Sequence, residues 1–423
     1  MNVAAILLRI IAVSVLTLIY CSVYLISLLR PAWRKRGFRR QDRILVIGTF
    51  HNPNWFQSHI VPLAKCRIGQ VILVCDEPVF QLENVHYICP PKIANRLLTR
   101  AGAKFFYAVA ASVRYRPDMY MGYHIFPGAI SALVLGSIFN RPACYQDTSG
   151  PLELAGGGWK AENRLLVALG GPSKLVEWAV FTVVRRFDMI VVRGRSAKQY
   201  IEDIGCRNML SIITGSIDVK GEWYNWDQRD IDLIFVGRLI KAKNPAVFLA
   251  TVVELNRNIP NIRAVMIGEG PDMAELAGLC TEHGLNGQVE LLGQRNDVMA
   301  WYQRAKVFVL PSAWEGVSIA MLEAMASGCV PVVSKVGDLG DLVVPGKNGY
   351  LIDEIKTESF SKHTARLLQD QAHWAEYSRQ ARLDAMNYSG LTAVADKWHH
   401  DLNRLIAGQS GKVRKLSDTE QEK

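Results

Sequence analysis

The sequence lacks the cysteine patterns of a disulfide scaffold or a structural zinc site. Its eight cysteines are scattered singly, with no Cys-x-x-Cys, and no cluster of histidines and cysteines is present. We therefore expect buried free thiols in a reducing compartment and no bound metal. No lysine is marked out for Schiff-base chemistry, which argues against a pyridoxal phosphate enzyme. The net charge is +10, but aromatic residues are not interleaved with basic ones, so we expect no nucleic-acid partner.

The N-terminal apolar run is also unlike a cleaved signal peptide. Residues 10–29 carry no charge and lead directly into Arg30, without a small-residue cleavage site. A signal peptide would have an apolar region of only about 7 to 15 residues. A helix of residues 10–29, at about 1.5 Å per residue, matches a bilayer core of about 30 Å. We therefore expect residues 1–42 to hold a membrane anchor.

Basic residues are concentrated after this run, whereas only Arg9 lies near its other end. Those after the run are Arg30, Arg34, Lys35, Arg36, Arg39, Arg40 and Arg43. This asymmetry predicts the orientation of the anchor helix in the membrane. By the positive-inside rule the body of the protein is cytoplasmic, with anionic lipid headgroups as a partner. A mildly polar stripe leaves monotopic insertion open, although the length of the run favours spanning. The stripe comprises Ser14, Thr17, Cys21, Tyr24 and Ser27.

From Arg43 onward, short apolar runs alternate with helical stretches, which predicts mostly parallel sheets covered on both faces. In the first half we expect strands at 44–47, 71–75, 86–89, 119–123, 143–146, 189–192 and 211–214. In the second half we expect them at 233–236, 262–267, 289–292, 307–310 and 330–333. The chain length has room for two such α/β domains, at residues 43–220 and 221–390. The tail, residues 408–423, is polar and charged, so we expect it to be disordered.

Two carboxylates, Glu315 and Glu323, lie eight residues apart in the segment from Pro311 to Pro331. This segment reads P-S-A-W-E-G-V-S-I-A-M-L-E-A-M-A-S-G-C-V-P. Ser318 is a good N-cap and Gly328 a good C′ residue, so a short helix should begin after Ser318 and Glu315 should precede it. Glu323 lies on a small, apolar face of that helix. A carboxylate there needs a hydrogen-bonding partner, which a pair of ligand hydroxyls would supply. A solvated surface charge is the alternative.

This segment resembles the E-x7-E motif of retaining glycosyltransferases of family 4, also called glycosyl transferases group 1. Before it come V-G-R-L-I-K-A-K-N (236–244), I-G-E-G-P (267–271) and V-E-L-L-G (289–293), in that family's order. After it comes V-P-G-K-N-G-Y-L-I (344–352), similar to the family's strand-ending turn. The resemblance covers about residues 229–355. It implies a GT-B fold, with two Rossmann-like domains facing across a cleft and a final helix, residues 391–407, crossing back to the first.

The resemblance also implies roles for individual residues around a nucleotide-diphosphate sugar. Glu315 contacts the sugar hydroxyls, Glu323 the ribose hydroxyls, and Arg238 and Lys243 the diphosphate, whose charge they neutralise. The backbone N–H groups of Gly316, Val317 and Ser318 suit a phosphate at a helix N-terminus. Gly268 and Gly270 fit close backbone approach to a ligand, and Gly293, Gln294 and Arg295 lie where related enzymes hold the base. The family generally needs no divalent ion, and we interpret Asp230-Ile-Asp232 as a surface turn.

The first domain departs from better-known members of the family. Their glycine-rich loop after the first strand is replaced here by T-F-H-N-P-N-W (49–55). His124 and Asp147 each follow an expected strand, so either is a candidate polar assistant near the transferred sugar or a capped loop residue. The stretch 149–160 contains three consecutive glycines, and we expect a mobile loop with Trp159 as an aromatic contact.

Together these features predict a membrane-anchored retaining glycosyltransferase. It would move a hexosyl group from a nucleotide sugar to a glycan acceptor in synthesis of cell-envelope polysaccharide. The anchor favours a lipid-linked acceptor, because it would confine enzyme and acceptor to the same membrane. A nucleotide-sugar-binding scaffold without activity and a hydrolysing nucleotide-sugar epimerase are the alternatives. The base, the sugar, the acceptor and the oligomeric state stay open.

Overall fold

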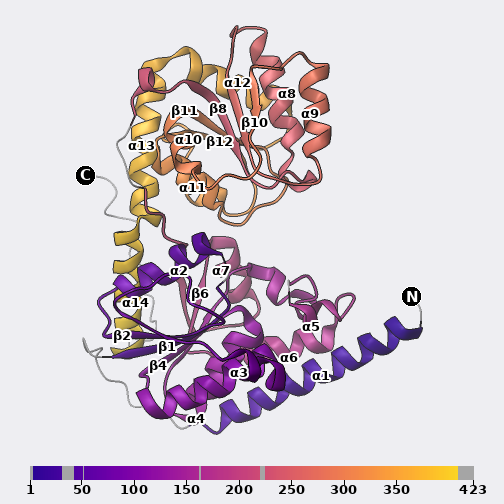
Figure 1. Cartoon of the computed structure of the whole chain (residues 1–423), viewed down its shortest axis with the longest axis vertical. Coiled ribbons are helices and arrows are strands. Elements are labelled where there is room, and N and C mark those ends of the chain that lie inside the picture. The colour runs from indigo at the N-terminus through magenta and orange to yellow at the C-terminus, as the bar shows by residue number, and fades with distance from the viewer. Residues whose placement is uncertain (1–2, 31–41, 51, 162, 220–223, 408–423) are drawn as a thin grey trace. The chain divides into compact units, whose positions relative to one another are not determined.

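The computed structural model describes residues 3–30, 42–50, 52–161, 163–219 and 224–407 (Figure 1). Three segments for which we made predictions from the sequence lie outside the described residues. They are the basic flank at 34–40, positions 220–223 at the expected boundary between the two domains, and the tail at 408–423. The chain divides into two compact units, which we treat separately. The first comprises Met1–Arg193, Ala197–Ile213 and Ala395–Lys423; the second comprises Gly194–Ser196 and Thr214–Val394.

The first unit contains a seven-stranded parallel sheet in the order β3-β2-β1-β4-β5-β6-β7. Its strands are β1 (Arg43–Ile47), β2 (Gln70–Val74), β3 (Val85–Ile88), β4 (Met119–Tyr123), β5 (Ala143–Gln146), β6 (Met189–Val192) and β7 (Met209–Ile212). The central strands are apolar on both faces because helices cover both sides. The strand order reverses between β1 and β4, and in open α/β sheets ligands bind outside the carboxyl ends of the strands at such a point.

Helices surround this sheet and pack on its two faces. They are α1 (Val3–Leu28), α2 (Pro53–Lys65), α3 (Lys92–Tyr115), α4 (Ile130–Ile138), α5 (Arg164–Val167), α6 (Lys174–Val184), α7 (Arg195–Asp203) and α14 (Leu391–Ala407). Helix α2 begins where it does because the Asn52 side chain accepts hydrogen bonds from the backbone N–H groups of Asn54 and Trp55, and Pro53 occupies the first turn. The residues that replace the expected glycine-rich loop therefore form a helix cap.

Helix α1, the expected anchor, packs lengthwise against α4 and α6 of the first unit (Figure 1). Ala12, Leu16, Tyr20 and Val23 are buried at helical spacing and belong to the same hydrophobic core as α6. Of the polar stripe noted in the sequence, only Ser27 is buried on this face. Thr17, Cys21 and Tyr24 are half-buried, and Tyr24 packs against the same core, so the stripe shares in a contact that the buried apolar side chains dominate.

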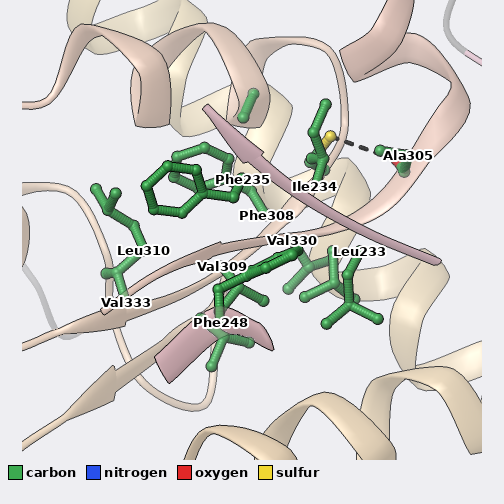
Figure 2. Close-up of a cluster of buried hydrophobic side chains, with 14 of the residues drawn as sticks. Leu233, Ile234, Phe235, Phe248, Ala305, Phe308, Val309, Leu310, Val330 and Val333 are labelled. Atoms are coloured by element: carbon green, nitrogen blue, oxygen red, sulfur yellow. Dashed lines mark hydrogen bonds between the residues drawn. The ribbon is translucent and has the colours of Figure 1, made fainter. Parts of the chain in front are cut away.

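The second unit contains a six-stranded parallel sheet in the order β10-β9-β8-β11-β12-β13. The strands are β8 (Ile231–Val236), β9 (Ala264–Ile267), β10 (Val289–Leu291), β11 (Ala305–Leu310), β12 (Val330–Ser334) and β13 (Tyr350–Ile352). The helices are α8 (Pro245–Asn256), α9 (Met273–Glu282), α10 (Val298–Arg304), α11 (Ile319–Ala326), α12 (Thr357–Gln369) and α13 (Gln371–Ser389). Figure 2 shows part of its core, in which side chains of β8, β11 and β12 pack with Phe248 of α8.

The expected fold class is confirmed, since each unit is a Rossmann-like parallel sheet. All of the expected strands are present, with β7 beginning two residues earlier than expected. One strand, β13, was missed because it has only three residues and follows directly on the turn that the sequence pattern emphasised. In both sheets the strand order reverses next to the first strand of the unit, between β1 and β4 in the first unit and between β8 and β11 in the second.

Candidate functional site

Three loops at the carboxyl ends of β8, β9 and β10 are joined by backbone hydrogen bonds. Gly237 N donates to Ile267 O at 3.0 Å, Leu239 N to Glu269 O at 2.9 Å, and Gly268 N to Gly293 O at 2.9 Å. We call these three loops the rim of the second unit. A rim held by main-chain bonds presents fixed donors and acceptors next to the β8/β11 reversal.

The two glycines after β9 lie where loops of the rim pack closely against one another. A Cβ on Gly268 would lie 1.8 Å from Gly237 O, and a Cβ on Gly270 would lie 2.1 Å from Leu239 O. Gly268 also has a φ of +145°, which favours glycine. Both glycines are therefore required by close packing between loops of the chain itself, and their expected approach to a ligand stays a prediction.

Lys243 and Glu315 are brought together across the β8/β11 reversal. Lys243 Nζ donates to the Glu315 carboxylate, and Ser312 Oγ donates to the same carboxylate at 2.7 Å. The two loops are also joined by the main chain, since Ala313 N donates to Ala242 O at 2.9 Å. Glu315 is buried, so its charge is compensated by a cation that itself stays partly exposed. Arg238, the other expected phosphate contact, is exposed and forms no ion pair with a residue that the structure describes.

The loop after Glu315 leads into α11 as the sequence predicted. The Ser318 side chain accepts from Met321 N and caps the helix, and Gly328 beyond its end has a φ of +87°. Gly316 is exposed with open space beside its Cα, whereas Val317 is half-buried. The N–H groups at this end have no partners within the helix, so the end is suited to an anion.

Glu323 lies within α11 and is largely removed from solvent. Burial raises the pKa of its carboxyl to about 7. Among the residues that the structure describes, none donates a hydrogen bond to this carboxylate. A buried carboxylate without a donor is destabilised when ionised, so it would gain from a ligand that brings hydroxyl groups.

The remaining predicted residues of the second unit lie at its surface. Gly293 has a φ of +64°, and Gln294 is exposed. Arg295 is also exposed and forms a two-point ion pair with Asp297, at 2.8 and 2.7 Å. The carboxylates of the D-x-D sequence lie at the opposite end of β8: Asp230 binds Arg304 at 2.6 Å and Asp232 binds Lys306 at 2.9 Å. These ion pairs agree with the interpretation of D-x-D as a surface feature.

The first unit has a cavity of about 300 Å³ at its own strand reversal, between the ends of β1 and β4. Its lining mixes apolar residues with polar and charged ones, which include His124, Glu153 and Lys104. Lys104 is buried and donates to Asp76 at 2.9 Å and to Thr49 Oγ1 at 2.6 Å. A concave site in which polar groups converge among apolar ones is typical of small-molecule binding.

His124 is held at the cavity by the buried carboxylate of Glu153. His124 Nδ1 lies 2.7 Å from Glu153 Oε1, while Glu153 Oε2 accepts from Ile125 N at 2.8 Å and from Tyr145 Oη at 2.9 Å. Burial acts to lower the pKa of His124, but the hydrogen bond and charge of Glu153 outweigh it and the pKa is raised. The backbone of His124 has a φ of +58°, a costly conformation that this network maintains.

Asp147 does not line the cavity, so the structure separates the two candidates of the first unit. Its Oδ1 accepts from Gly150 N at 2.8 Å, as in a capped loop, and it is fully buried. Burial, and then the charge of Glu153, raise the pKa of Asp147. The structure thus places His124 at the cavity and Asp147 in a capped loop, and a catalytic role for either stays a prediction.

The stretch 149–160 is folded, contrary to the expectation of a mobile loop. It forms two 3-10 turns, Gly150–Glu153 and Ala155–Gly157. Its glycines have positive φ values and pack closely, since a Cβ on Gly157 would lie 2.8 Å from the Val176 side chain of α6. The glycines therefore serve close packing, and Trp159 is partly buried against the core.

Two functional candidates, Glu153 and Lys104, were missed by the sequence analysis. Glu153 follows no motif, and its partners come from β5 and from the loops after β4 and β5. Lys104 had a usable signal, because it is a lone charge in the apolar stretch A-G-A-K-F-F-Y. A lysine that falls on the packed face of a helix needs a buried acceptor, which here is Asp76.

Comparison with known proteins places these features in a family. Residues 220–384 match the family described as Glycosyl transferases group 1. The chain is 33% identical over 157 residues to UDP-Gal:alpha-D-GlcNAc-diphosphoundecaprenol alpha-1,3-galactosyltransferase of Escherichia coli, covering 36% of this chain and 41% of that one. It is 29% identical over 159 residues to alpha-monoglucosyldiacylglycerol synthase of Acholeplasma laidlawii, covering 37% and 39%. The matches therefore span less than half the length of these two relatives.

Similarity to a solved structure extends over both units. Anabaena HepE, crystallised with UDP and glucose, superposes with a TM-score of 0.64 at 16% identity, over 85% of this chain and 98% of that one. At this identity the likeness establishes the fold alone. Residues 220–384 of the second unit therefore match the glycosyl transferases group 1 model, and the chain has the GT-B fold.

Proposed function

We propose that this chain is a retaining glycosyltransferase of family 4 that transfers a hexosyl group from a nucleotide-diphosphate sugar to a lipid-linked glycan acceptor. The observation that carries the proposal is the convergence of Lys243, Glu315 and the N-terminus of α11 at the β8/β11 reversal of the second unit. A cation, a buried carboxylate and unsatisfied N–H groups at one point match a ligand that carries both phosphates and sugar hydroxyls.

In the proposed reaction the protein acts by positioning and electrostatics. An acceptor hydroxyl attacks the anomeric carbon on the face from which the nucleotide leaves. The new C–O bond forms as the bond to the β-phosphate oxygen breaks, and the acceptor proton passes to the departing phosphate. Lys243, Arg238 and the N–H groups of α11 stabilise the charge that develops on the diphosphate. Glu315 orients the sugar hydroxyls, and no step requires a metal ion.

The acceptor is assigned to the first unit. Its cavity lies at the β1/β4 reversal and presents His124 beside apolar side chains. The two relatives are named for diphosphoundecaprenol-linked and diacylglycerol acceptors, which supports an acceptor with a lipid part. The apolar length of α1, from Ala4 to Leu28, supports work at a membrane.

Donor turnover tests the proposal directly. The full chain, in detergent micelles, is incubated with UDP-, GDP- and ADP-sugars, and release of sugar and nucleotide is followed for the wild type and Glu315→Gln. The matched control is Glu282→Gln, which neutralises an exposed glutamate at the end of α9. We expect slow hydrolysis of one class of donor, lost in Glu315→Gln and kept in the control.

The same experiment distinguishes the alternatives. Tight donor binding without turnover, even after lipid-linked saccharides are supplied, would indicate a scaffold. Release of free nucleotide with an epimerised sugar would indicate a hydrolysing epimerase. An anomer of inverted configuration in the transfer product would contradict the retaining mechanism.

A further inference from the structure

We propose that α1 lies flat on the membrane surface as a structural part of the first unit, with one face in the protein core and the opposite face in lipid. The proposed function places the protein at a membrane but does not say whether α1 spans the bilayer. This inference refines it by placing α1 parallel to the bilayer. It depends on contacts of α1 alone, so it can fail while the transferase proposal stands.

The inner face of α1 is built into the domain core. Leu16 and Tyr20 are fully buried, and the Tyr20 hydroxyl lies within electrostatic reach of Glu153, the residue that holds His124. The contacts continue to both ends of the helix. Arg9 Nη2 donates to Pro172 O at 2.9 Å, and Arg186 Nη2 donates to Ser27 O at 2.9 Å.

A spanning arrangement would require α1 to leave this position. The large side chains of its inner face would lose their packing, and each fully buried residue of that size contributes about 1.5–3 kcal/mol. The ion pair between Arg30, just beyond α1, and Asp188, at 2.7 Å, would also be lost. The buried contacts therefore favour a helix that stays on the domain.

The outer face of α1 is apolar and exposed. Leu7, Ile11, Leu18 and Leu25 are all exposed, on the side away from Leu16. A helix that is apolar on every side needs an apolar environment on every side. Protein supplies it for one face of α1, and the other face has no protein partner among the residues that the structure describes.

Helix α6, which packs on α1, also exposes side chains typical of a lipid interface. Leu175 is exposed, Trp178 is 58% exposed, and Lys174 is exposed at the start of the same helix. Tryptophan is enriched at membrane–water interfaces, and long basic side chains reach the headgroups. The protein has a net charge of +10, so anionic lipid is the occupant that charge complementarity favours over a second copy of this cationic chain.

Topology gives the first test. Inverted membrane vesicles from cells that express the full chain with an N-terminal epitope tag are treated with protease, with and without detergent. If α1 lies flat, the tag is on the same side as the catalytic units and is digested without detergent. A tag protected until detergent is added would show that α1 spans the membrane and would overturn the proposal.

Vesicle binding gives the second test. The full chain is floated with vesicles of phosphatidylcholine and phosphatidylglycerol and with vesicles of phosphatidylcholine alone. Leu18→Glu, on the outer face, should lower the bound fraction by about tenfold or more, because a buried leucine is lost and a charge is added. The matched control Leu383→Glu places the same charge at an exposed leucine of α13 and should bind like the wild type.

The outcomes of both tests are independent of sugar transfer. Donor hydrolysis in detergent should be the same for Leu18→Glu and the wild type, so loss of vesicle binding with retained turnover supports the proposal. Equal flotation of Leu18→Glu and the wild type would overturn it. A detergent-free dimer that Leu18→Glu dissociates, without flotation of the wild type, would assign the face to a second copy and would also overturn it.

Discussion

Replacing Glu323 by glutamine should make the second unit more stable at alkaline pH and weaken its binding of nucleotides. Burial raises the pKa of this carboxyl from 4.5 to about 7, a difference of about 2.5 units. At about 1.36 kcal/mol per unit, ionising Glu323 in the folded state costs about 3 kcal/mol. The folded-state pKa is the higher one, so the stability is fully present below pH 4.5 and is lost as the pH rises through 7.

Glutamine has the same shape and never ionises, so the variant should not show this loss. The assay is urea unfolding of the wild type and Glu323→Gln at several pH values between 5 and 9, with Glu282→Gln as the control for an exposed site. We expect the unfolding free energy of the wild type to fall relative to that of Glu323→Gln by up to about 3 kcal/mol across this range. Parallel pH dependences for the two proteins would refute the reasoning.

Nucleotide binding completes this prediction. Ribose hydroxyls would donate to the ionised carboxylate, so binding of the cognate nucleoside diphosphate should tighten as the pH rises from 6 to 8 and should release protons. Glu323→Gln should weaken binding by about tenfold or more, since a hydrogen bond to a charged group is worth about 1.5–3 kcal/mol. Titration calorimetry in two buffers of different ionisation enthalpy measures both effects. Affinity independent of pH and of the substitution would exclude a contact with ribose.

Three further predictions follow from contacts in the two units. Lys243→Met should abolish donor turnover and lower the melting temperature, because it leaves the buried carboxylate of Glu315 without its cation; normal turnover would contradict the proposed role. Glu153→Gln should lower the pKa of His124, because it removes the charge that raises that pKa; NMR titration of the histidine ring protons measures the shift, and an unchanged pKa would refute the pairing. Arg229→Leu should destabilise the second unit by about 3 kcal/mol or more, because the buried guanidinium donates to four backbone carbonyls, and urea unfolding measures the loss; a change below about 1 kcal/mol would contradict the assigned contacts.

The sequence was most informative where one local pattern decides the structure. Buried parallel strands are short apolar runs, so β4, β5 and β6 were predicted at their observed bounds. The cap at Ser318 and the loop position of Glu315 were likewise local properties of one segment. The pairing of Glu315 with Lys243 was not local, because it joins loops after two different strands.

Other features depended on tertiary contacts that no single segment encodes. Glu153 gains its significance from partners on β5 and in the turn after β4, so nothing near it in the sequence marks it. The glycines at 156–158 were expected to give mobility, yet they allow close packing against α6. Helix α1 is apolar on all sides, so its sequence could not indicate which face enters the core.

The rim of the second unit limits how its loops can be redesigned. The loops that contain Gly237, Gly268 and Gly293 exchange main-chain hydrogen bonds in series, and a side chain at Gly268 would collide with Gly237 O. A loop transplanted singly from another enzyme would have to reproduce backbone positions that its two neighbours determine. Chimeras should therefore exchange all three loops as one module, whereas point substitutions should be confined to outward-facing side chains such as Gln294, which can change without moving the backbone.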